Sequence, residues 1–137
     1  MTEADLQRIE STLGLQLPAF YRGYMLEYPR WLPESQPEGY DVAAWEFTND
    51  PARVIHFNRY VREFESGEFF DDIPWPDHYF VIGSEQEQNW YFLDFREGSQ
   101  TVYDFHHEMG NVGRVAGSLS EFPVVLLEWW EDVARAG

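Results

Sequence analysis

The chain of 137 residues contains no cysteine and no lysine. Without cysteine it forms no disulfide and offers neither a thiol nucleophile nor a thiolate ligand for zinc. It also lacks any apolar run of the roughly 18 residues that a membrane-spanning helix needs. The N-terminal segment MTEADLQRIE carries acidic residues where a signal peptide would have its apolar core. We therefore expect a cytoplasmic protein, with a single domain spanning residues 1–137.

Charge of one sign dominates the chain. Nine basic residues, all arginine, stand against 25 aspartate and glutamate residues, which gives a formal net charge of −16 at pH 7. Nucleic acids and anionic membranes are bound through cationic side chains, so this balance opposes direct binding to either. The excess of negative charge favours a basic protein partner and would accelerate association with it. An acidic surface also keeps a protein soluble, so charge alone leaves both interpretations open.

Aromatic residues make up 18% of the chain. Each can bury ~150–250 Å², so we expect most of them in the core. The remainder are expected at the surface, where tyrosine and tryptophan are favoured in interfaces.

The first half of the chain predicts helices. Thr2 and Asp5 have the spacing of a capping box, and Pro18 suits the first turn of a second helix that ends before Pro29. Asp50-Pro51 has the pattern of an N-cap and first residue of a mid-chain helix.

The second half predicts strands and a last helix. The expected strands are a short one over Val42–Phe47, then Tyr79–Ile82, Trp90–Phe95, Thr101–His106 and an edge strand near Val112–Val115. The C-terminal helix has Pro123 in its first turn and Ser120 as its predicted N-cap. This order indicates an α+β fold, in which a mainly antiparallel central sheet packs against N-terminal helices, a mid-chain helix and a C-terminal helix.

Several motifs, in this order, resemble the SUKH superfamily, the cell-wall-assembly-regulator and Syd-like domains. The matching residues are Leu13-Gly14, Leu17-Pro18, Tyr21, Phe80-Val81-Ile82-Gly83-Ser84, Tyr91-Phe92-Leu93-Asp94, Val102-Tyr103 and Ser120-Glu121-Phe122. The turn Glu85–Asn89 departs from the family pattern because it lacks glycine. The resemblance implies a non-enzymatic module without a cofactor. It also implies kinship with bacterial immunity proteins that bind and neutralise a toxin, often a nuclease, and with general scaffold domains.

An acidic, aromatic stretch without any basic residue follows the mid-chain helix. Its members are Glu63, Glu65, Glu68, Asp71, Asp72 and Asp77, with Phe69, Phe70 and Trp75 interleaved. Carboxylates around exposed aromatic rings could engage the arginine and lysine side chains of a basic toxin. The alternative is a solvated helix end and loop whose aromatic rings pack into the core.

A second candidate binding group lies on loops near Ser84. It consists of Glu85, Glu87 and Asp94. Loops held by a rigid sheet often carry binding function, although polar hairpin tips without function have the same composition.

Asp104, His106, His107 and Glu108 form a third group. Asp104 and His106 share one face of a strand, because side chains alternate along it. Two ligands are fewer than zinc requires, and no nucleophile motif accompanies a possible acid–base pair. Polar residues on an exposed strand face are the alternative interpretation.

Two further positions carry structural predictions. Asn58 lies on the apolar face of its helix and is expected to satisfy backbone groups of a neighbouring loop. Trp129 and Trp130 are adjacent, so only one of them can face the core.

These observations predict a non-enzymatic protein that binds and occludes a basic partner, namely an immunity protein against a toxin. A scaffold or regulatory domain with another partner is the alternative, and a small metal-dependent hydrolase around His106 is a remote one. No metal or cofactor is expected.

Overall fold

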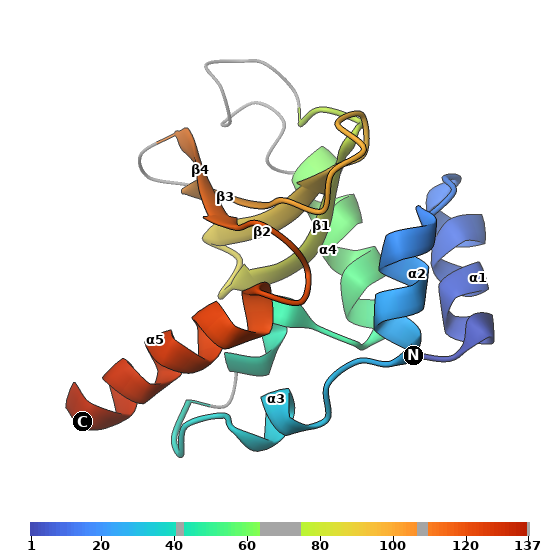
Figure 1. Cartoon of the computed structure of the whole chain (residues 1–137). Coiled ribbons are helices and arrows are strands. Elements are labelled where there is room, and N and C mark those ends of the chain that lie inside the picture. Colours follow the sequence, from blue (N-terminus) through green and yellow to red (C-terminus); the bar gives the residue numbers. More distant parts are fainter. Residues whose placement is uncertain (41–42, 64–74, 107–109, 137) are drawn as a thin grey trace.

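The computed structural model describes residues 1–40, 43–63, 75–106 and 110–136, and Figure 1 shows their arrangement. The elements, in chain order, are α1 (Glu3–Leu13), α2 (Ala19–Leu26), α3 (Trp31–Glu34), the 3₁₀ helix η1 (Ala43–Phe47), α4 (Pro51–Glu63), β1 (Tyr79–Glu85), β2 (Asn89–Asp94), β3 (Val102–His106), β4 (Asn111–Ala116) and α5 (Phe122–Ala136). The α+β class is confirmed, with helices before, beside and after an antiparallel sheet.

Local side-chain chemistry sets the helix starts. The hydroxyl of Thr2 accepts from the backbone N–H of Asp5, and the Asp5 carboxylate accepts from the N–H of Thr2, so the predicted capping box is confirmed. Asp50 likewise accepts from the N–H of Ala52, at 3.0 Å. Helix α5 differs from the prediction, because Ser118 and not Ser120 accepts from the N–H of Glu121.

The four strands form one sheet in the order β1-β2-β3-β4, each antiparallel to its neighbour. In the turn between β1 and β2, Gln86 and Glu87 have φ angles of 54° and 59°. This left-handed conformation costs a residue other than glycine roughly 1–2 kcal/mol. The hydroxyl of Ser84 accepts from the N–H of Glu87 at 2.8 Å and thereby stabilises the turn.

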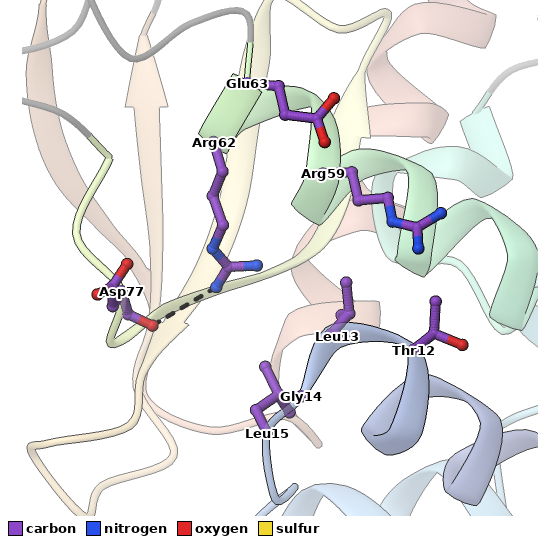
Figure 2. A pocket seen from close by; sticks show the side chains of 8 residues that line it. All are labelled: Thr12, Leu13, Gly14, Leu15, Arg59, Arg62, Glu63 and Asp77. Carbon is purple, nitrogen blue, oxygen red and sulfur yellow. Dashed lines mark hydrogen bonds between the residues drawn. The ribbon is translucent and has the colours of Figure 1, made fainter.

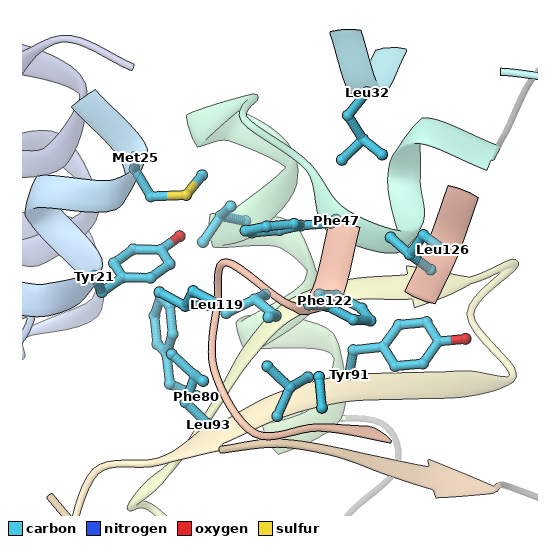
Figure 3. Close-up of a cluster of buried hydrophobic side chains, with 14 of the residues drawn as sticks. Tyr21, Met25, Leu32, Phe47, Phe80, Tyr91, Leu93, Leu119, Phe122 and Leu126 are labelled. Atoms are coloured by element: carbon cyan, nitrogen blue, oxygen red, sulfur yellow. The ribbon is translucent and has the colours of Figure 1, made fainter. Parts of the chain in front are cut away.

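The sheet has a core on each face. Figure 3 shows the larger core, where Tyr21 of α2, Phe47 of η1 and Phe122 of α5 gather over Phe80 and Tyr91 of the sheet. The second core lies on the opposite face and contains Phe57, Val61, Trp75, Val81, Trp90, Phe92 and Phe105. Helix α4 contributes to both cores because it lies along the outer edge of β1.

Asn58 of α4 covers that edge of β1. Its side-chain amide donates to the carbonyl of Val81 and accepts from the N–H of Val81, both at 2.9 Å, and it also donates to the carbonyl of Val54. A side chain thus takes the place of a neighbouring strand. The predicted structural role is confirmed, but the partner is a strand edge and not a loop.

The strand predicted over Val42–Phe47 is wrong, because its described part forms the 3₁₀ helix η1. A strand there would need the backbone groups of β1 that Asn58 already occupies. Instead η1 crosses β1 at Gly83, where the missing side chain lets the Glu46 backbone approach. The N–H of Thr48, just after η1, donates to β1, at 3.3 Å from the carbonyl oxygen of Ile82.

Candidate partner-binding surface

Those acidic residues predicted to bind a partner that the structure describes lie at opposite ends of the sheet. Glu85 is the last residue of β1 and Glu87 lies in the turn that follows, whereas Asp77 precedes β1. Asp94 is at the Asp77 end as well, because it pairs with Tyr79. The seven residues of β1 separate the two ends by roughly 20 Å. The structure therefore does not bring Asp94 or Asp77 together with Glu85 and Glu87.

Most of the acidic, aromatic stretch falls outside the described residues: Glu65, Glu68, Phe69, Phe70, Asp71 and Asp72. Trp75 is described and is only 3% exposed. Its indole N–H donates to the carbonyl of Tyr79 at 3.0 Å, and its ring meets Phe92 edge-on. For Trp75 the alternative interpretation holds, since its ring packs in the core.

A pocket of about 450 Å³ opens between the end of α1 and the end of α4, next to Asp77. Figure 2 shows its charged side chains, Arg59, Arg62, Glu63 and Asp77. Arg62 donates to the backbone carbonyl of Asp77 at 3.5 Å, and burial lowers the pKa of its guanidinium. Two arginines offset two carboxylates, so the pocket has no net charge, and no histidine is among its described lining residues.

At the other end of the sheet, two histidines pair with carboxylates. His56 Nε2 lies 2.9 Å from Glu87 Oε1, and His106 Nε2 lies 2.8 Å from Asp104 Oδ2. The prediction that Asp104 and His106 share one strand face is therefore confirmed. His107 and Glu108 lie outside the described residues, and nowhere in the described part do three potential metal ligands gather.

Glu46 is a buried carboxylate that the sequence analysis did not single out. It is 4% exposed. Its oxygens accept from the Tyr40 hydroxyl at 3.0 Å, the Trp130 indole at 3.3 Å and the Tyr91 hydroxyl at 3.5 Å. Burial raises its pKa, and the negative charge of Glu85 raises it further. Glu46 thus holds η1, β2 and α5 together through three neutral donors.

The raised pKa of Glu46 predicts a change in pH dependence for Glu46→Gln. In the unfolded chain this carboxyl titrates near 4.5, and in the folded protein at a higher pH. The folded state therefore binds the proton more readily, and Glu46 lowers stability as pH rises through the raised pKa. Glutamine keeps the shape but cannot ionise. We expect the melting temperature of Glu46→Gln, relative to that of the wild type, to rise as the pH increases above about 4.5. A difference between the two melting temperatures that stays constant over this pH range would contradict the raised pKa of Glu46.

Trp129 and Trp130 of α5 face different surroundings, as predicted. Trp130 is 2% exposed and reaches Glu46, whereas Trp129 is 41% exposed and contacts Tyr91 with ring centroids 6.4 Å apart. Trp129 is therefore an exposed aromatic side chain at the Glu85 end of the sheet.

Helices before, beside and after an antiparallel sheet define an α+β protein. A family model describing the SMI1 / KNR4 family (SUKH-1) matches residues 1–123, so the chain belongs to that family. Its members are protein-interaction domains of the immunity and regulatory type, and they are generally non-catalytic. No curated protein and no solved structure matches the chain. Within the described ranges, no helix combines the length and apolarity needed to cross a bilayer.

Proposed function

We propose that this protein is an immunity protein that binds a basic toxin domain in the cytoplasm and neutralises it by occlusion. The observation that carries the proposal is the net charge of −16 in a member of an interaction-domain family. Such a charge attracts a cationic domain from a distance, and nucleases carry cationic surfaces because their substrates are polyanions.

Two acidic groups are the proposed contacts. The first comprises Glu65, Glu68, Asp71, Asp72 and Asp77 with the rings of Phe69 and Phe70. The second comprises Glu85 and Glu87 at the β1–β2 turn. Glu87 already pairs with His56 at 2.9 Å, so a partner arginine would replace or share that contact.

The test is co-expression with the product of the adjacent gene. We expect a stable complex and restored growth of cells that the neighbour alone would kill. Association should slow steeply as ionic strength rises, because exposed charges are screened beyond ~10 Å at 0.1 M salt. A complex whose association rate ignores salt would contradict the electrostatic part.

Variants in which amides replace carboxylates test which surface binds the partner. Glu68→Gln with Asp71→Asn and Asp72→Asn is expected to slow association roughly tenfold and leave the melting temperature unchanged. A matched control, which also removes three negative charges, is Glu128→Gln with Glu131→Gln and Asp132→Asn, at exposed positions of α5. If the wild type, the acidic-stretch variant and the control bind the partner with equal affinity, the acidic stretch is not a contact. A non-toxic neighbour that still binds would indicate a scaffold or regulatory domain instead.

A further inference from the structure

A small pocket lies on the face of the sheet opposite α5, at the Asp94 end. It is lined by Tyr79, Phe92, Asp94, Glu97, Tyr103 and Val112. Its volume is about 190 Å³. Sites for drug-sized ligands begin near ~300 Å³, so this pocket has the size for one side chain and not for a nucleotide.

Three aromatic rings line the pocket. Tyr79 stacks on Phe92 with centroids 4.4 Å apart, and Phe92 stacks on Tyr103 at 5.7 Å. The planes in each pair are within 27° of parallel, and the row crosses three neighbouring strands. Phe92 is 1% exposed, whereas the two tyrosines are partly exposed. A cation is attracted over the face of a ring and not at its edge, so the two partly exposed tyrosines, and not the buried Phe92, supply the aromatic contribution to cation binding.

Two carboxylates stand at the edge of these rings. Glu97 accepts from the Tyr103 hydroxyl at 2.9 Å, a bond that raises the pKa of this tyrosine. Asp94 accepts from the backbone N–H of Arg96 at 2.9 Å. The nearest histidine contact is from His78 to Asp94, at 4.0 Å. Each carboxylate keeps further lone pairs available for a donor from outside.

We propose that this pocket binds an arginine side chain presented by the partner protein. A guanidinium is planar, stacks on aromatic faces and donates to two carboxylates at once, which a lysine ammonium does less well. The apolar stem of the arginine would lie against Val112, which is 39% exposed. The inference rests on the proposed function in taking the partner to be basic, and it adds an anchoring site at which specificity is set.

The pocket can be tested without the partner. The probe is N-acetyl-arginine amide, titrated into isotopically labelled protein while the amide signals of Tyr103 and Val112 are followed by NMR. The matched probe is the citrulline derivative, which has nearly the same shape and no charge. We expect the arginine probe to bind at least about tenfold more tightly, as expected for loss of a charge-assisted contact. Equal shifts with both probes would overturn a cation site.

Variants then assign the contacts. Glu97→Gln and Tyr103→Leu are each expected to weaken the arginine probe several-fold, whereas Tyr103→Phe keeps the ring and most of the binding. Glu87→Gln, at the far end of β1, is the control for a general loss of negative charge. The proposal is overturned if Glu87→Gln weakens the probe as much as Glu97→Gln does.

A last arm distinguishes a partner side chain from a free small molecule. If the pocket holds a partner arginine, Glu97→Gln weakens the complex with the adjacent-gene product, and the arginine probe competes with that product. A complex that forms normally with Glu97→Gln would overturn the assignment to the partner and leave the proposed function intact. Probe binding without any complex would instead contradict the proposed function and leave the cation pocket intact.

Discussion

Gly83→Ala is expected to destabilise the protein by about 3 kcal/mol or more, which is the upper part of the range for overpacked sites. A Cβ atom at Gly83 would lie 1.9 Å from the carbonyl oxygen of Glu46 and 2.8 Å from that of Trp45. Both are backbone atoms, so no flexible side chain can move aside. The 3₁₀ helix η1 must then lift off β1, and the bonds that Glu46 makes to Tyr91 and Trp130 are lost with it.

The measurement is urea unfolding followed by tryptophan fluorescence. Gly23→Ala is the matched control, because a Cβ there meets nothing within 4 Å and Gly23 lies inside α2. Alanine is the better helix former by roughly 0.5–1 kcal/mol, so the control should be slightly more stable than the wild type. If both variants unfold at the wild-type urea concentration, η1 does not lie against Gly83.

The sequence predicted the elements that short-range chemistry decides. In the Thr2–Asp5 capping box and the Asp50 cap, donor and acceptor are at most three residues apart in the chain. The residue pattern alone therefore predicts both caps. The serine that accepts a backbone N–H before α5 was predicted as Ser120 and is Ser118, because the two serines have the same chemistry and only the turn geometry separates them.

Contacts between distant residues were not predictable in the same way. The segment around Trp45 is apolar and aromatic enough for a strand, and what prevents one is Asn58, which occupies the edge of β1. Asn58 and Val81 are 23 residues apart. No periodicity in either segment reveals that they meet.

In the candidate binding surface, too, short-range relations were predicted and long-range ones were not. The sequence predicted that Asp104 and His106 share a strand face, since alternation fixes this locally. It grouped Asp94 with Glu85 because they are near in the chain, whereas an antiparallel hairpin places them at opposite ends. The buried role of Glu46 was not predicted, because its three hydrogen-bond donors are 6, 45 and 84 residues away in the chain.

Replacement of Asn58 tests the long-range contact on which the sheet edge depends. Asn58→Ala is expected to lower the free energy of unfolding by about 3–5 kcal/mol. It leaves the buried N–H and carbonyl of Val81 without a partner, each at roughly 1–3 kcal/mol, and it opens a cavity. Arg59→Ala is the control, since Arg59 is exposed on the same helix and its loss should change stability by no more than ~0.5 kcal/mol.

Hydrogen exchange separates loss of this bond from general destabilisation. In Asn58→Ala, the Val81 amide should exchange faster than amides in the middle of β2, because only the former loses its acceptor. Asn58→Asp refines the test, since aspartate keeps an acceptor for the Val81 N–H but places a second oxygen against the Val81 carbonyl. We expect it to be as destabilising as Asn58→Ala, while it protects the Val81 amide better. Uniform acceleration of exchange along β1 and β2 in both variants would show that Asn58 fills space and does not cap the strand edge.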